Sequence, residues 1–295
     1  MLRVRKQLGL TDRLLLSCGT NGTTVAVLDT GIGNHPDFGN RILLFRDFIN
    51  NRKKNYDDSG HGTHVAGCIA GNGYASNGKH KGMAPHSRLL IGKVLNNQGD
   101  GNVEEMINGI EWVLENQYRY NIRILNISIG MSDSTGKERM DRLLTAVDAA
   151  WAEGLIVVCA AGNTGPDLMS LSPIGALKNV ITVGCNEAGY LGNRKYLCEH
   201  YSGRGSGLYD TIKKPDIVAP GTDIISCNLN NSYVAKSGTS MATPIVSGAL
   251  ALLLQKYPYL GNNEAKQILL KTATDLKQPW SKQGHGLINV AKMLS

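Results

Sequence analysis

Short apolar segments alternate with helical patterns along most of this chain. Near-continuous apolar runs predict strands that are buried on both faces, at residues 23–28, 89–94, 122–129, 155–160 and 180–183. Apolar residues at helical spacing predict helices at 64–70, 103–115, 140–153, 240–257 and 263–274. Strands that alternate with helices indicate an α/β fold, in which helices cover both faces of a mainly parallel sheet.

The pattern predicts one large domain after a short N-terminal extension. Residues 4–20 are expected to form a short helix that ends in a Gly-Thr-Asn-Gly turn. No repeat, low-complexity tract or linker interrupts the remainder. We therefore expect an extension at 1–22 and a single domain at 23–295.

Three polar residues lie at or just past the ends of predicted strands, namely Asp29, Ser128 and Asn163. Ligands of open parallel sheets bind outside the carboxyl ends of the strands, so these side chains mark a candidate site. Asp29 follows an apolar strand and should be largely removed from water. An unpaired buried carboxylate is costly, and an imidazole N–H would be a suitable partner. Alone, Asp29 could equally be a turn residue.

Two histidines stand at the start of a predicted helix, in Gly60-His61-Gly62-Thr63-His64. Zinc peptidases need His-Glu-x-x-His, and no glutamate lies between these two residues. We therefore expect His61 to act as a general base and His64 to be a structural histidine that hydrogen-bonds nearby backbone.

Ser240 stands at the predicted N-terminus of a long apolar helix, in Ser237-Gly238-Thr239-Ser240-Met241. The helix dipole and free backbone N–H groups there favour a developing negative charge. Alone, Ser240 would be read as a helix cap. A serine hydroxyl becomes nucleophilic beside a base, and the order Asp29, His61, Ser240 is the order found in subtilisin.

With these motifs, the chain resembles the subtilisin family (subtilases) of serine endopeptidases from residue 23 to about residue 294. Further matching segments are Asn126–Gly130, Ala160–Gly165, Lys214–Gly221 and Gly284–Asn289. The resemblance implies a subtilisin-like single-domain, three-layer sandwich and peptide-bond hydrolysis through an acyl-enzyme. It also implies that Asn163 and the Ser240 N–H stabilise the oxyanion.

The same resemblance implies a substrate groove. Residues expected to contact an extended substrate are Gly99, Asp100, Gly101, Ser128, Ile129, Gly130 and Gly162. Val103 and Met106, together with Ile129, should line an apolar pocket upstream of the cut. Thr164 and Leu171 should border the pocket next to it, and Leu171 stands where familiar members carry glycine, which would make that pocket shallower.

Catalysis of this kind requires no cofactor, although a structural calcium ion is an expectation from the family. Asp37 matches a common calcium ligand, and Asn77 lies in the partner loop at 71–82. That loop is longer than usual and carries Lys79, His80 and Lys81. Calcium prefers oxygen ligands and is repelled by nearby cations, so the loop opposes the assignment.

Charge and composition bear on whether the chain binds nucleic acid or a membrane. The net charge is +7, but the basic residues are scattered and the 17 aromatic residues do not interleave with them, so we expect no nucleic acid partner. The resemblance to subtilases implies protein or peptide substrates. No apolar run is long enough to span a membrane.

Several of the six cysteines stand where small buried hydrophobes belong, and we expect reduced thiols in a cytoplasmic protein. The alternative is a secreted mature form, without its signal and prodomain, that has up to three disulfides.

Two rival functions share the same site. One is a catalytically silent peptide-binding pseudoprotease, and the other is a peptide ligase or acyltransferase that uses the same acyl-enzyme. The sequence predicts neither the natural substrate nor the oligomeric state.

Overall fold

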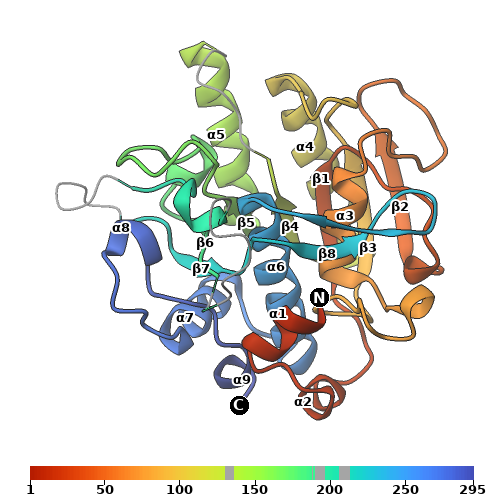
Figure 1. Ribbon diagram of the computed structural model, residues 1–295. Coiled ribbons are helices and arrows are strands. Elements are labelled where there is room, and N and C mark those ends of the chain that lie inside the picture. Colours follow the sequence, from red (N-terminus) through yellow and green to blue (C-terminus); the bar gives the residue numbers. More distant parts are fainter. Residues whose placement is uncertain (130–135, 188, 190–196, 206–212) are drawn as a thin grey trace.

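The computed structural model describes all residues except 130–135, 188, 190–196 and 206–212. Its centre is a seven-stranded parallel sheet with strand order β2-β3-β1-β4-β5-β6-β7 (Figure 1). The strands are β1 Thr24–Asp29, β2 Ile42–Asp47, β3 Arg88–Lys93, β4 Ile122–Ile127, β5 Ile156–Ala160, β6 Ile181–Cys185 and β7 Ile217–Ala219. The predicted parallel sheet is therefore confirmed.

The interior strand β1 is buried at all six positions. It pairs in parallel with β3 on one side and β4 on the other, with Asp29 opposite Lys93 and Leu28 opposite Ile127. A strand between two others and covered on both faces has no polar side, which is why its sequence shows no alternation. The arrangement carries Asp29 to the carboxyl edge of the sheet.

Two pairs of long helices flank the sheet and confirm the three-layer sandwich (Figure 1). The helices α3 (His61–Ala70) and α6 (Thr239–Lys256) pack against each other, and α4 (Val103–Tyr120) packs against α5 (Lys137–Ala152). A capping box between Asn102 and Glu105 begins α4. The remaining helices are α7 Asn262–Thr272, α8 Trp280–Gln283 and α9 Val290–Met293, with short 3-10 turns η1 Pro36–Phe38, η2 Tyr74–Ser76, η4 Ile174–Ala176 and η6 Cys198–His200.

Some elements differ from the prediction. The segment 4–20 was expected to hold one helix, but two are present, α1 (Leu2–Gln7) and α2 (Asp12–Ser17). The break includes Gly9, where φ is +74° and an added Cβ would lie 2.8 Å from Cβ of Ala291. Close packing of α1 against the C-terminal segment therefore favours a turn at this point.

Three short strands and one edge strand were missed by the apolar pattern. The strands β8 (Ile224–Cys227) and β9 (Tyr233–Lys236) form an antiparallel hairpin, and β7 has only three residues. The edge strand β2 is half-buried along most of its length. Strands this short or this exposed lack the continuous apolar run that identifies the central ones.

The cysteine prediction is wrong for one pair. Cys185, the last residue of β6, forms a disulfide with Cys198 of η6, with a Cα–Cα distance of 5.7 Å. The other four cysteines are free thiols and are buried. Burial accounts for those four, but the pairing depends on a turn of the chain that brings residues 13 positions apart together.

Within the described residues, no helix has both the length and the apolar character that crossing a membrane requires.

Candidate active site

The candidate site lies at the carboxyl edge of the central strands. Asp29 is the last residue of β1, and Ser128 and Asn163 follow β4 and β5. The sheet therefore brings together the three strand ends that the sequence singled out.

The side chain of Asp29 is fully buried and contacts His61. Its Oδ1 lies 2.7 Å from Nδ1 of His61 and accepts a 2.8 Å hydrogen bond from the Thr30 N–H. Its Oδ2 is buried and receives no hydrogen bond within the described residues. A buried carboxylate held on Nδ1 orients the imidazole and leaves Nε2 free to accept a proton.

His61 is the first residue of α3 and follows Gly60, which has a φ of +80°. Its side chain is 24% exposed, so the ring remains accessible from the solvent side. Burial alone would lower the pKa of His61, but the charge of Asp29 and the hydrogen bond to it outweigh that effect and raise the pKa above its ordinary value. The contact with Asp29 therefore strengthens His61 as a general base.

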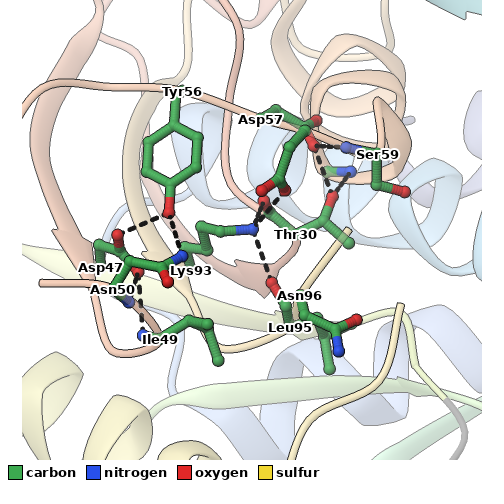
Figure 2. Close-up of polar contacts among 12 residues, drawn as sticks. Thr30, Asp47, Ile49, Asn50, Tyr56, Asp57, Ser59, Lys93, Leu95 and Asn96 are labelled. Carbon is green, nitrogen blue, oxygen red and sulfur yellow. Dashed lines mark hydrogen bonds and ion pairs between the residues drawn. The ribbon is translucent and has the colours of Figure 1, made fainter. Parts of the chain in front are cut away.

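A hydrogen-bond network around Thr30 joins the end of β1 to the start of α3 (Figure 2). The Thr30 hydroxyl donates to Oδ1 of Asp57 at 2.9 Å and accepts the Gly62 N–H at 2.9 Å. The other oxygen of Asp57 accepts the N–H of Thr63 at 2.9 Å and its hydroxyl at 2.6 Å. Thr30 and Asp57 therefore fix the relative position of Asp29 and His61.

A buried lysine completes this network (Figure 2). Lys93, at the end of β3, has no exposed surface. Its Nζ donates to the Thr30 carbonyl at 2.8 Å, the Leu95 carbonyl at 2.7 Å and Oδ1 of Asp58 at 2.7 Å. All three ammonium protons therefore have acceptors, as burial of such a charge requires.

Ser240 is the second residue of α6, whose N-cap is Gly238. Within the described residues, no hydrogen bond joins its hydroxyl to His61. The helices that carry the two residues, α3 and α6, pack against each other. Pro244 occupies the second turn of α6.

Asn163 is held in place by the residue before Ser240. Its Oδ1 accepts both the N–H and the hydroxyl of Thr239, each at 3.0 Å. Because the oxygen is used in this way, the Nδ2 donors remain for another partner. That nitrogen lies 3.5 Å from the place that a Cβ would take at Gly238.

His64 is structural, as its position suggested. Its side chain is fully buried, and its Nε2 lies 2.8 Å from the Ile224 carbonyl. Burial lowers its pKa to about 3. The ring is therefore neutral at physiological pH and hydrogen-bonds to the hairpin strand β8.

The predicted substrate residues fall into two groups, the first on two loops and the second made of buried residues. Thr164 and Leu171 lie on one loop, since the Thr164 hydroxyl donates to the Ser170 carbonyl at 3.1 Å and Gly162 packs against Ser172. Gly99, Asp100 and Gly101 lie in an exposed turn before α4.

In the second group, Val103 and Met106 are each only 1% exposed and Ile129 is 8% exposed, so they offer little open surface. Ser128 is also buried, and its hydroxyl accepts a hydrogen bond from Asn126. Gly130 lies outside the described residues. The contacts of all these residues with a substrate remain predictions.

The surroundings of Asp37 do not fit a calcium ion. Its Oδ1 accepts the Ala75 N–H at 2.9 Å, and its Oδ2 accepts the Tyr233 hydroxyl at 2.9 Å and the Cys227 thiol at 3.5 Å. Calcium needs six to eight oxygen ligands, whereas here hydrogen-bond donors surround the carboxylate. No hydrogen bond joins Asn77 to Asp37 in the described part of the chain, and we assign no metal to this pair.

Sequence reasoning missed four supporting residues, which are Thr30, Asp57, Lys93 and Thr239. Two signals were available, because Thr30 and Thr239 directly adjoin Asp29 and Ser240. The burial of Lys93 gave no signal, since a lysine at the end of a strand is ordinarily exposed.

Comparisons with known proteins agree with this geometry. The model of the subtilase family matches residues 20–286. The chain is 42% identical over 276 residues to the serine protease AprX of Bacillus subtilis, covering 86% of this chain and 61% of that protein. It is 36% identical over 271 residues to subtilisin Savinase of Lederbergia lenta, covering 91% of this chain and 89% of the relative. The solved structure of sphericase matches with a TM-score of 0.79 and 30% identity, over 92% of both chains. The chain thus spans less than two thirds of AprX.

Proposed function

Because the chain belongs to the subtilase family, we propose that it is a serine endopeptidase with Asp29, His61 and Ser240 as its catalytic triad. The single observation that supports this most strongly is the 2.7 Å contact between Nδ1 of His61 and the buried Oδ1 of Asp29. It orients a general base whose pKa is raised by that same carboxylate.

The reaction has two halves. Ser240 Oγ attacks the carbonyl carbon of the scissile peptide while Nε2 of His61 takes the hydroxyl proton. His61 then gives that proton to the leaving amine, the C–N bond breaks, and an acyl-enzyme ester remains on Ser240. A water molecule, deprotonated by His61, hydrolyses the ester and restores the serine.

Negative charge on the carbonyl oxygen develops beside Asn163 and the Ser240 N–H. Thr239 occupies the Asn163 carbonyl oxygen, which leaves the Nδ2 hydrogens to donate to the oxyanion. Ser240 stands in the first turn of α6, where backbone N–H groups have no helical partner. Both donors are held before the substrate arrives.

Substrate selection is expected to come from side pockets, because backbone pairing with the turn at Gly99–Gly101 and with Ser128–Gly130 accepts any sequence. Val103, Met106 and Ile129 would contact a residue upstream of the cut, with the first two as a buried floor. Leu171 would narrow the pocket that Thr164 borders. We therefore expect cleavage after small or medium side chains rather than after large aromatic ones.

The disulfide supports a location in an oxidising compartment. Disulfides persist outside the cytoplasm and are rare inside it, and Cys185 and Cys198 are paired. This favours the secreted alternative over the predicted cytoplasmic location.

The test replaces Ser240 with alanine and uses Ser237→Ala as a matched control in the same motif. Within the described residues, the one hydrogen bond of the Ser237 hydroxyl is the one it accepts from the Asp223 N–H at 3.0 Å, so its loss should leave peptide hydrolysis within about threefold. Ser240→Ala should abolish hydrolysis of an internally quenched peptide, and wild-type activity in that variant would refute the proposal.

The same assay separates the rival functions. A silent pseudoprotease would show no turnover in the unmodified chain. A ligase would transfer the acyl group to an added amine in preference to water, whereas an endopeptidase releases the free carboxylic acid.

A further inference from the structure

A cavity of about 760 Å³ lies at the amino-terminal ends of the strands, whereas Asp29 lies at a carboxyl end. Residues at or before the starts of strands line it, including Thr23 ahead of β1 and Arg88 at the first position of β3. Asp29 ends β1, so a six-residue strand, about 20 Å long, separates the two sites. The cavity is therefore not part of the catalytic groove.

Three arginines of neighbouring strands line this cavity, Arg41, Arg88 and Arg123. Arg41 precedes β2, and its carbonyl accepts the Leu89 N–H at 2.8 Å, while Arg88 donates its N–H to the Thr23 carbonyl at 3.1 Å. Arg123 lies in β4, on the other side of β1. Three strand spacings separate β2 from β4, so the backbone positions that carry the arginines lie along about 14 Å of sheet edge.

The lining of the cavity contains no aspartate or glutamate. The Arg41 guanidinium donates to the Ala70 carbonyl at 2.6 Å and the Ser87 carbonyl at 2.9 Å. That of Arg123 donates to the Pro258 carbonyl at 2.7 Å and the Leu260 carbonyl at 2.6 Å. These acceptors are neutral, so they satisfy the donors without compensating the charges. For Arg41, the nearby Asp37 carboxylate compensates part of the charge.

Arg88 differs from the other two. Its guanidinium makes no hydrogen bond or ion pair in the part of the chain that the structure describes. His86 also lies in the lining. Burial lowers the pKa of both Arg41 and Arg123, because their charged forms lose the stabilisation that water would give, and Asp37 restores only part of that stabilisation for Arg41. An anion in the cavity would supply it.

We propose that this arginine cavity, defined by Arg41, Arg88 and Arg123, binds a small anion that carries two or three phosphate or carboxylate groups. Guanidinium groups recognise both kinds of group through paired N–H donors. A single anionic group would contact one arginine, whereas an anion with several such groups can contact more than one. The site lies beyond the peptidase chemistry and does not depend on it.

The test uses the Ser240→Ala chain, which cannot digest itself if the proposed peptidase function is correct. Tripolyphosphate, citrate and sodium chloride are compared at equal ionic strength by calorimetric titration and by thermal unfolding. Arg88→Ala is the informative variant, because its guanidinium holds no part of the described fold. Arg139→Ala is the matched control, since Arg139 is exposed on α5 and outside the cavity lining.

Tripolyphosphate or citrate should raise the melting temperature above the chloride control, and the stronger of the two identifies phosphate or carboxylate as the preferred group. Arg88→Ala should weaken the binding of the preferred anion about tenfold, and Arg139→Ala should weaken it less than twofold. Equal weakening by both variants would indicate general attraction to a chain of charge +7 and would overturn the proposal. The absence of any stabilisation beyond chloride would overturn it as well.

Discussion

Removing the disulfide between Cys185 and Cys198 should destabilise the fold by a predictable amount. The bridge closes a loop between residues 13 positions apart. In the chain-entropy description, a cross-link of this length removes conformational freedom from the unfolded chain worth about 3 kcal/mol at 25 °C. For a chain of 295 residues, the entropy of unfolding converts this loss into a fall in melting temperature of about 5 °C.

The native surroundings of the bridge add to that expectation. A Cβ at Gly221 would lie 2.3 Å from Sγ of Cys185, so the sulfur packs directly against this glycine. The Gly221 carbonyl in turn accepts the N–H of Gly238 at 2.9 Å, and Gly238 caps the helix that carries Ser240. Loss of the bridge should therefore also lower kcat in the active chain.

The assay is thermal unfolding of Ser240→Ala with and without a phosphine reductant, beside the double variant Cys185→Ser/Cys198→Ser. Thiol titration of the denatured chain should give four thiols before reduction and six after it. The double variant should melt about 5 °C lower and should not respond to the reductant. If six thiols are counted in the reduced chain while its melting temperature stays within 1 °C of the oxidised one, the entropy argument is refuted.

Three further changes test other parts of the account. Asp29→Asn removes the charge that raises the pKa of His61, so the rise of kcat/KM with pH should move from above pH 6.5 to below it. The value of kcat should fall by about 10⁴. An unchanged pH profile would contradict the role of Asp29. Lys93→Met leaves the carbonyls of Thr30 and Leu95 without their donor, at a cost of about 2–4 kcal/mol in urea unfolding, and equal stability would contradict this. Leu171→Gly should increase kcat/KM for peptides with an aromatic residue before the cut relative to those with alanine, and an unchanged ratio would remove Leu171 from the pocket.

The central strands and long helices could be predicted because their burial determines which of their positions are apolar, and this pattern is visible in the local sequence. A strand such as β1, which is buried on both faces, needs apolar residues throughout. The helix α4 begins at a capping box formed by Asn102 and Glu105. The edge strand β2 is only half-buried, and the strands of the hairpin β8–β9 are short, so fewer of their positions must be apolar. Their sequences therefore do not distinguish them from loops.

The site could be predicted only as far as chain order and strand ends allow. Asp29 and His61 stand out because each follows or begins an element, and the fold does bring them into contact. The burial of Lys93 and the pairing of Cys185 with Cys198 depend on segments that are distant in sequence, and no local pattern reports such contacts.

The central claim is that His61 makes Ser240 nucleophilic, and covalent labelling measures this directly. A fluorophosphonate probe, followed by peptide mass spectrometry, should modify one serine of the chain, Ser240, and His61→Ala should slow that labelling by at least about 10³. Labelling of Ser240 at an equal rate in His61→Ala, or none in the unmodified chain, would contradict the account.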